Sequence, residues 1–350
     1  INLITFISVI LRHETIWEAM KQKGMRLPGN GSLHDLTEAL IVKEPTNLAG
    51  FLKSFEIFLP AFRGDLELIE KISYEFVEDQ ARQDVVYCEA RFCPQLLMPS
   101  YNLDSSKNKG DITIDIILQT VLKGLKRGEE QFGTKVRVIL CCIRGIPEWS
   151  WDILRLCDEY RDKGVVAIDI AGSEATDATA DETTDETDMA VFKAAKDKGI
   201  HRTVHAGETG PAEVVRKSLE DLYAERIGHG YHVVEDEQLY QQCIQNSVHF
   251  EVCPISSYLT GAIGAMATSS KRHPVLRFAE DGASFSINTD DPTVTKTSLR
   301  DEYVFLSQFG FTEAHFTKAN FEAARNSFLP QSEKDALIKK LRQAYGIVDY

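Results

Sequence analysis

Residues 201–230 read HRTVHAGETGPAEVVRKSLEDLYAERIGHG, and this stretch decides the fold. Two short runs, 201–205 and 226–230, have the length and residue types of strands. They flank an amphipathic stretch, 212–225, that has the periodicity of a helix. A strand, a helix and a second strand in this order predict a unit with two parallel strands.

The same alternation recurs along the whole chain. Strand-like runs lie near 2–10, 85–93, 136–143, 165–171, 201–205, 226–230, 248–253 and 284–289. Amphipathic stretches that can supply the crossovers lie at 66–83, 112–132, 189–198, 212–225 and 235–246. The strand-like runs are largely apolar rather than alternating, as expected for a parallel sheet covered on both faces. Eight such units predict an α/β fold, a TIM (β/α)8 barrel.

One stretch, 11–84, is helical in pattern and long for a single crossover. We expect it to form additional helices that cover the mouth of the barrel. The sequence shows no internal repeat and no linker, so residues 1–350 are predicted to form a single barrel domain. The chain starts at Ile rather than Met, and we expect its true N-terminus to be absent or altered.

Composition excludes some classes of protein. A net charge of −14 over 350 residues argues against a protein that grips phosphate backbones of nucleic acids. The seven cysteines are odd in number and form no C-x-x-C pair, which indicates reduced, buried thiols in a cytoplasmic protein. No run approaches the ~20 apolar residues of a membrane helix. The apolar start, 1–11, lacks the basic residues and cleavage site of a signal peptide.

The segment 174–188 is rich in Asp, Glu, Thr and Ala. An acidic docking loop and a solvated surface loop both fit this composition. We favour the solvated loop, because charge runs usually lie on the surface.

Polar residues gather where the predicted strands end, which in a TIM barrel is the catalytic rim. Each has a structural explanation alone, such as a tight turn or the cap of the next helix. Together they offer imidazole and carboxylate groups, which suit a divalent ion such as zinc. The residues are His205, Glu208, His229, Asp290, Asp291 and the open glycine Gly172.

Four motifs carry a resemblance to a known family. They are IHRTVHAGETG at 200–210, ERIGHGYH at 225–232, HFEVCPISSYLTGA at 249–262 and SINTDDP at 286–292. The sequence resembles the adenosine deaminase family, of the vertebrate type, from about His13 to its end. The resemblance implies a zinc-dependent hydrolase that converts adenosine and 2′-deoxyadenosine to inosine and 2′-deoxyinosine, with release of ammonia.

The resemblance also implies the roles of the catalytic residues. His205 and Asp290 would be zinc ligands, and Asp290 would also help to deprotonate the attacking water. Glu208 would protonate the purine N1 as hydroxide attacks C6. His229 would orient and stabilise that hydroxide.

Substrate binding is implied in the same way. Asp291 would hydrogen-bond the ring near N7, and the backbone N–H of Gly172 would meet N3. Leu48, Phe51 and Phe55 match a lid helix of the family that shields the purine from water. Their spacing alone fits an ordinary buried helix face equally well.

The sequence departs from the family at its first strand. The family pattern is His-x-His-Leu-Asp-Gly, and both histidines bind zinc. Here the matching positions are Ile4, Phe6, Ser8 and Val9, and His13 already belongs to the next helix. We therefore expect strand 1–11 to be truncated or altered, and zinc to bind poorly to the chain as written. The alternative is a catalytically impaired protein that binds purines without turnover.

Three further alternatives concern the partner and the location. Free adenine or an adenine nucleotide would need the same chemistry, and the nucleotide would also need a basic phosphate pocket that the acidic chain does not show. The nucleic-acid base deaminases use H-x-E with P-C-x-x-C, and neither motif occurs here. The family resemblance adds a cell-surface protein partner, and with it a cell-surface or extracellular location beside the cytoplasm.

Overall fold

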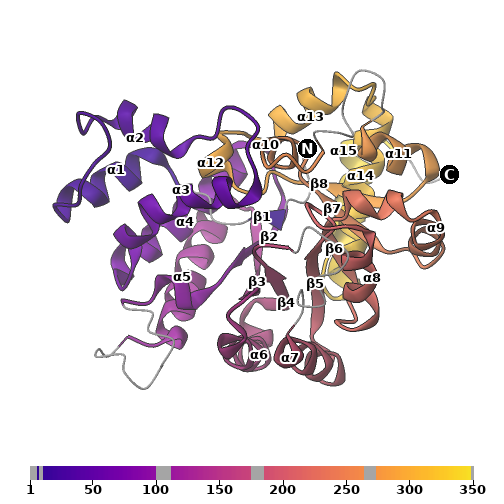
Figure 1. Cartoon of the computed structure of the whole chain (residues 1–350), viewed down its shortest axis with the longest axis horizontal. Helices are drawn as coiled ribbons and strands as arrows, with labels where there is room; N and C mark the ends of the chain where they lie inside the picture. Colours follow the sequence, from indigo (N-terminus) through magenta and orange to yellow (C-terminus); the bar gives the residue numbers. More distant parts are fainter. Residues whose placement is uncertain (1–5, 8–10, 100–111, 175–184, 264–272, 348–350) are drawn as a thin grey trace.

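The computed structural model describes residues 6–7, 11–99, 112–174, 185–263 and 273–347. Parallel strands form one 8-stranded sheet whose order follows the chain. They are β1 (Phe6–Ile7), β2 (Tyr87–Phe92), β3 (Lys135–Ile143), β4 (Val165–Ala171), β5 (His201–Ala206), β6 (Arg226–His229), β7 (His249–Val252) and β8 (Ser284–Ile287). The strands lie at the centre of the molecule with helices around them, which is a TIM barrel (Figure 1).

Helices connect and surround the strands. They are α1 (His13–Gln22), α2 (Leu33–Leu40), α3 (Leu48–Phe62), α4 (Leu66–Arg82), α5 (Ile114–Phe132), α6 (Ser150–Glu159), α7 (Glu186–Asp197), α8 (Ala212–Glu220), α9 (Glu237–Gln245), α10 (Pro254–Leu259), α11 (Pro274–Asp281), α12 (Pro292–Thr295), α13 (Leu299–Ser307), α14 (Glu313–Asn326) and α15 (Gln331–Ala344). Single 3₁₀ turns are η1 (Pro94–Leu97), η3 (Pro147–Trp149), η4 (Arg161–Lys163) and η5 (Tyr231–Glu235).

The sequence predicted every one of these strands and their barrel, and most boundaries agree within two residues. The first strand is the exception. Of the predicted run 2–10, the structure describes only β1, whose Phe6 lies opposite Glu89 and whose Ile7 lies opposite Ala90. The crossover predicted to end at 225 also ends earlier, because α8 stops at Glu220.

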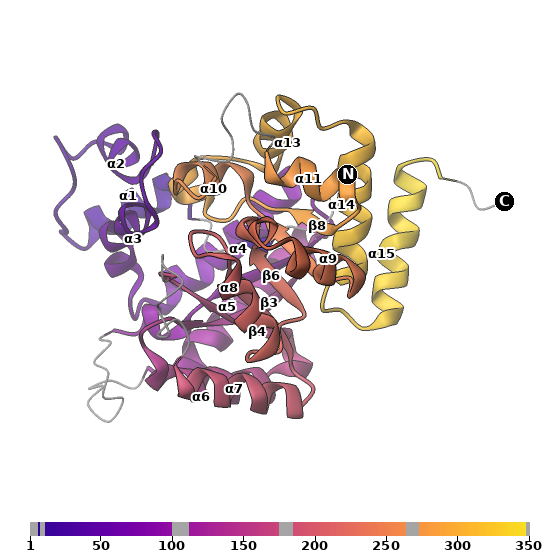
Figure 2. The same ribbon diagram turned by 45° about the vertical axis from the view of Figure 1, so that its right-hand side comes forward.

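The first and last units of the barrel are joined by a pair of hydrogen bonds. The backbone N–H of Leu11, after β1, donates to Thr293 Oγ1, after β8, at 2.7 Å. The Thr293 hydroxyl in turn donates to the Leu11 carbonyl at 3.1 Å. The helices predicted from 11–84 begin directly after this seam. Of these, α1 and α2 lie beside the barrel, while α3 lines the cavity described below (Figures 1 and 2).

The barrel interior holds charged side chains, although the strands read as largely apolar. Arg91 is bound to Asp169 at 2.9 Å and to Glu251 at 2.5 Å. Arg226 is bound to Glu251 at 2.7 Å and to Glu89 at 2.8 Å. All five side chains are buried. Buried charges persist only when they are paired. Here β2, β4, β6 and β7 contribute both positive and negative side chains, so each buried charge has an opposite charge beside it.

The prediction that 174–188 is a solvated loop is wrong at both ends. Residues 175–184 lie outside the described residues. Glu174 is buried and accepts backbone hydrogen bonds, and Asp188 is buried in α7, where Ser150 Oγ donates to it at 2.5 Å. The composition of the segment does not distinguish Glu174 and Asp188, which are buried and hydrogen-bonded, from its other acidic residues.

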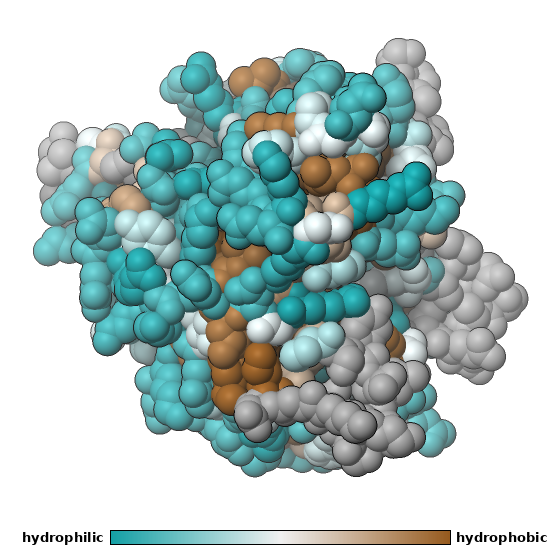
Figure 3. Space-filling view, turned by 90° about the vertical axis from the view of Figure 1, so that its left-hand side faces the viewer, coloured by the Kyte–Doolittle hydropathy of each residue, from teal (hydrophilic) through white to brown (hydrophobic). Residues whose placement is uncertain are grey.

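Other predictions from composition concern the cysteines and the surface. The seven cysteines are free and buried, as expected. Among the described helices, none is long and apolar enough to cross a membrane. The face that carries α1–α3 is mostly hydrophilic, with hydrophobic residues gathered near its centre (Figure 3).

Candidate functional site

A cavity of about 460 Å³ lies between α3 and the carboxyl ends of the strands, and all the residues predicted for the site line it. Its volume is within the usual range for small-molecule sites. The predicted residues that it brings together are Leu48, Phe51, Phe55, Gly172, His205, Glu208, His229, Asp290 and Asp291. The barrel thus brings together residues that lie more than 240 positions apart in the sequence, from Leu48 to Asp291. We call this space the mouth cavity.

One wall of the mouth cavity is the apolar face of α3. The helix begins at an Asn47 cap, whose side chain accepts a hydrogen bond from the Gly50 N–H at 2.7 Å. Leu48, Phe51 and Phe55 then face the cavity at helical spacing. Such a wall suits a flat aromatic ligand and keeps water from it.

His205, at the end of β5, is held from behind by a carboxylate. Its Nδ1 lies 3.1 Å from Asp169 Oδ1 and 3.0 Å from Oδ2, so Nδ1–H donates and Nε2 is left for a ligand. Burial lowers the pKa of His205, but the charge and the hydrogen bond of Asp169, with the charge of Asp290, together outweigh burial and raise it. Asp169 also accepts from Arg91 and from the Cys141 thiol, at 2.9 Å and 3.2 Å. The charges of His205 and Arg91 hold its pKa well below the usual range, against the effect of burial.

Glu208 follows in the loop after β5, with 5% of its surface exposed. Thr260 Oγ1 donates to its Oε1 at 2.9 Å, and its Oε2 lies 3.5 Å from His229 Nε2. Burial raises the pKa of the carboxyl; His229 opposes this effect, while Asp290 and Glu174 add to it. A carboxyl group whose pKa is raised in this way holds its proton more readily and is better suited to act as a general acid.

His229 and Asp290 share an uncommon backbone conformation. Both are non-glycine residues in the left-handed region, with φ of 60° and 56°. Such strain persists where the surroundings impose it, and it clusters at functional sites. His229 Nδ1 lies 3.2 Å from Ser257 Oγ, and Ser256 Oγ donates to Asp290 Oδ2 at 2.8 Å.

These residues could hold a metal ion. His205, His229 and Asp290 offer one ligand atom each, and the three atoms lie within 4.8 Å of one another. Two imidazoles and one carboxylate suit zinc in kind, and three protein ligands are the number that a catalytic zinc site uses. The donor set therefore fits the ion. It includes His229, which the sequence predicted as a catalytic residue rather than a ligand.

The first strand adds nothing to this donor set. Phe6 lies in β1, while Ile4, Ser8 and Val9 are outside the described residues. None of the four residue types is a zinc donor of the kind that the family uses at these positions. The two histidines of the family pattern have no counterpart in the sequence.

Two residues predicted to meet the purine ring lie on the cavity wall. Gly172 follows β4 with φ of +112°, a conformation that other residues rarely adopt. A Cβ there would lie 3.5 Å from Arg144 N, so the backbone conformation rather than space requires glycine. Asp291 is buried at the start of α12.

Four residues at or behind the site were missed in the sequence. Asp169 and Arg91 hold His205; Thr260 and Glu174 hold Glu208 and its loop. Asp169 and Glu174 stand at the end of β4 beside Gly172, so their position at a strand end was a usable signal. Arg91 and Thr260 gave none, because their partners are distant in sequence.

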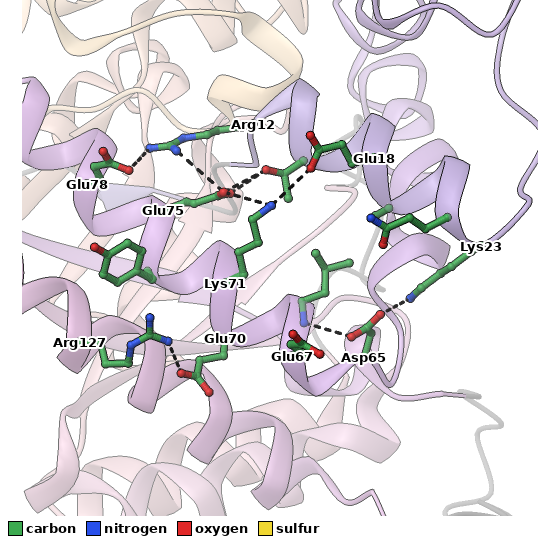
Figure 4. Close-up of a pocket in the computed structure, with 15 residues that line it drawn as sticks. Arg12, Glu18, Lys23, Asp65, Glu67, Glu70, Lys71, Glu75, Glu78 and Arg127 are labelled. Carbon is green, nitrogen blue, oxygen red and sulfur yellow. Dashed lines mark hydrogen bonds and ion pairs between the residues drawn. The ribbon is translucent and has the colours of Figure 1, made fainter.

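A second, larger space of about 780 Å³ lies between α1 and α4, and we call it the helical cleft (Figure 4). Charged side chains line it, and oppositely charged groups face one another across it. The ion pairs are Arg12 with Glu75, Glu78 and Asp79, Lys71 with Glu18 and Glu75, Lys23 with Asp65, and Arg127 with Glu70. The cleft is a seam of ion pairs between helices.

Comparisons with known proteins point the same way as the geometry. The model of a family described as adenosine deaminase matches residues 8–344. The chain is 43% identical to an adenosine deaminase of Xenopus tropicalis over 341 residues, which is 97% of this chain and 93% of that protein. It is 42% identical to an adenosine deaminase of Mus musculus over 338 residues, covering 96% and 94% of the two chains.

Solved structures share the fold at lower identity. An adenine deaminase from Arthrobacter aurescens superposes with a TM-score of 0.82 at 21% identity, over 99% of each chain. An amidohydrolase from Burkhoderia ambifaria, solved with bound Zn, has a TM-score of 0.79 at 20% identity, over 99% of this chain and 90% of that one.

Proposed function

Because the chain belongs to the adenosine deaminase family, a family of deaminase enzymes, we propose that it hydrolyses adenosine and 2′-deoxyadenosine. The products are inosine and 2′-deoxyinosine with ammonia, and the cofactor is zinc. The observation that carries this proposal is the mouth cavity, where every residue implied by the resemblance lines one space. The reduced state of its seven free cysteines favours the cytoplasm as its location.

Zinc, when bound, would lower the pKa of a water molecule to about 7 and so make hydroxide available at neutral pH. His205 and Asp290 would hold the ion, and His229 lies within reach as a third donor. His229 Nε2, which faces both Glu208 and Asp290, would orient the attacking water. Asp290 would help to take its proton.

The other residues would bind and protonate the purine. Glu208 would give its proton to N1, while Thr260 keeps the other carboxyl oxygen occupied. Asp291 would bind near N7, and the Gly172 N–H would bind N3. The apolar face of α3 would exclude bulk water from the ring.

The test is an assay of the purified chain with adenosine, combined with metal analysis. We expect adenosine absorbance to fall only when zinc is added, and a chelator to stop the reaction. We also expect less than stoichiometric zinc after dialysis, because β1 offers no histidines. Full zinc occupancy after dialysis would mean that His229 completes the donor set in place of the missing histidines, as a ligand and not only as a catalytic residue.

The second candidate is a catalytically impaired member of the family that binds purine nucleosides. Ile4 and Phe6, at the positions of the two zinc histidines, favour it. It predicts adenosine binding without loss of absorbance at any zinc concentration. A nucleotide substrate is less well supported: of the two cationic residues that line the mouth cavity, Arg63 and Arg91, the second is already bound to Asp169 and Glu251.

A further inference from the structure

Three consecutive backbone N–H groups in the loop after β5 donate to one carboxylate. Glu174 Oε1 accepts from Glu208 N at 3.4 Å, and Oε2 accepts from Thr209 N at 3.1 Å and from Gly210 N at 2.6 Å. Glu174 is 7% exposed and follows β4, the neighbouring strand. Its carboxylate therefore ties the loop that carries Glu208 to the adjacent unit of the barrel.

A second contact holds the side chain of Glu208 itself. Thr260 Oγ1, after α10, donates to Glu208 Oε1 at 2.9 Å. The Thr260 hydroxyl is buried, and its other acceptor, the Ser257 carbonyl, is farther away at 3.4 Å. Because Oε1 accepts this hydrogen bond, Oε2 is the oxygen that can carry a proton, and Oε2 is the one that faces His229.

We infer that Glu174 and Thr260 are positioning residues for the proton-donating carboxyl of Glu208. Glu174 fixes the backbone of residues 208–210, and Thr260 fixes the orientation of the carboxyl group. Neither needs to touch the purine. This inference rests on the proposed function, because it takes Glu208 to be the group that meets N1.

The distances explain why both contacts matter. A proton donor must lie within hydrogen-bond reach of the atom that it protonates, and a displacement of about 1 Å can cost ~10²-fold in rate. Glu208 is in a loop next to Gly207, whose φ is +67°, so the backbone there is free to turn unless it is held. Three hydrogen bonds from backbone N–H groups to one buried carboxylate remove that freedom.

The test compares Glu174→Ala, Glu174→Gln and Thr260→Val with the parent chain. Glutamine keeps the shape of the side chain but has one acceptor oxygen for three N–H donors, so it should rescue in part. Glu213→Gln is the matched control, since Glu213 lies in α8 of the same unit and is bound to Arg216 on the surface. Hydrogen–deuterium exchange of 208–210 reports on the backbone, and it requires no turnover.

The functional readout is the ratio of affinities for inosine and 1-deazainosine, measured by calorimetry. The second ligand has a C–H in place of the N1–H, so the ratio measures the contact between Glu208 and N1. Neither ligand is a substrate for deamination, so the ratio can be measured in an active or an inactive chain.

We expect the parent to prefer inosine by about 10-fold or more. The preference should fall towards 1 in Glu174→Ala and in Thr260→Val, with Glu174→Gln between parent and alanine. Exchange at 208–210 should rise in the two Glu174 variants and stay at the parent level in Thr260→Val. In an active chain, kcat should fall by about 10-fold to 100-fold in the same order, with KM changed less.

An unchanged preference in a folded Glu174→Ala or Thr260→Val protein would overturn the inference and leave the residues merely structural. Equal binding of the two ligands to the parent would overturn it too, because Glu208 would not meet N1. If the parent prefers inosine but does not deaminate adenosine, the proposed function fails while the variants still decide the inference. If the parent binds neither ligand, both fail.

Discussion

The mouth cavity and the helical cleft differ in how their charged groups are held. In the helical cleft, each basic side chain has one to three carboxylates opposite it, and most of these groups are partly exposed (Figure 4). In the mouth cavity, the two carboxylates Glu208 and Asp290 share one imidazole, since His229 Nε2 lies 3.5 Å from the first and 4.0 Å from the second, and Glu208 and His229 are buried. Burial and the like charges of Asp290 and Glu174 raise the pKa of Glu208, against the effect of His229.

The difference shows why the larger space is not the candidate site. Paired charges near the surface stabilise a helix packing arrangement and leave nothing for a ligand. Buried groups that lack a neutralising partner cost stability, and proteins keep such groups chiefly where function requires them. Substitutions should therefore change activity in the mouth cavity and stability in the helical cleft.

The largest expected effect is on turnover in the mouth cavity. Glu208→Gln removes the proton that the site delivers, so kcat should fall by ~10²–10⁴-fold. Zinc content and melting temperature should stay near those of the parent, because Gln fits the same space. An adenosine assay with metal analysis checks this, in the repaired variant below if the parent is too slow. Activity within a few-fold of the parent would make Glu208 structural.

The next effect is a gain. Ile4→His, Phe6→His, Ser8→Asp and Val9→Gly together restore the family pattern over residues 4–9. Residues two apart on a strand point the same way, so both histidines should face the barrel axis. Stronger metal binding should raise zinc-dependent turnover by about 10²-fold or more. A folded variant that takes up zinc and leaves adenosine unchanged would favour the non-catalytic candidate.

A smaller effect is expected behind the metal ligands. Asp169→Asn removes the charge that orients His205 Nδ1, and such substitutions cost about 10–100-fold in metal affinity. Competition with a fluorescent zinc chelator measures it. Asp158→Asn, which loses exposed pairs with Arg161 and Lys198, is the control and should leave zinc affinity unchanged.

The smallest effect is expected in the helical cleft. Arg12→Met leaves Glu75, Glu78 and Asp79 without their shared cation and should lower the free energy of unfolding by about 1–2 kcal/mol. Urea unfolding measures the loss, and kcat/KM should stay within about two-fold, because no residue of the mouth cavity is changed. Lys43→Met, in an exposed pair with Glu38, should change stability by less than about 0.5 kcal/mol. A loss of activity in Arg12→Met would make the cleft part of the site.

Sequence reasoning gave the barrel and the residues of its rim because both depend on local patterns. A strand such as β4 is recognised in the sequence as a run of mostly apolar residues. His205 and Asp290 are recognised as polar residues at the place where such a run ends. The residue types at the rim already indicated a divalent ion such as zinc. The ligand set, the catalytic roles and the substrate came instead from the resemblance, and these assignments stay predictions.

The rest depended on partners that a local pattern does not show. Glu174 begins an acidic segment, and although its place after β4 marks it as a rim residue, its partners are the N–H groups of 208–210, more than 30 residues along the chain. Asp188 was missed for the same reason, since Ser150 is far along the chain. Arg226 looked like an ordinary strand-start residue, yet it binds two carboxylates inside the barrel.

The buried ions of the barrel interior have a consequence for how the chain folds. Arg91 of β2 needs Glu251 of β7, and Glu89 of β2 needs Arg226 of β6, so partners come from opposite halves of the barrel. An intermediate that closes only β1–β4 would still pair Arg91 with Asp169, but it would bury Glu89 without Arg226, at a cost of about 3–5 kcal/mol. We therefore expect the two halves to assemble cooperatively. Fragments cut between β4 and β5 should be unstable apart and should regain structure when mixed.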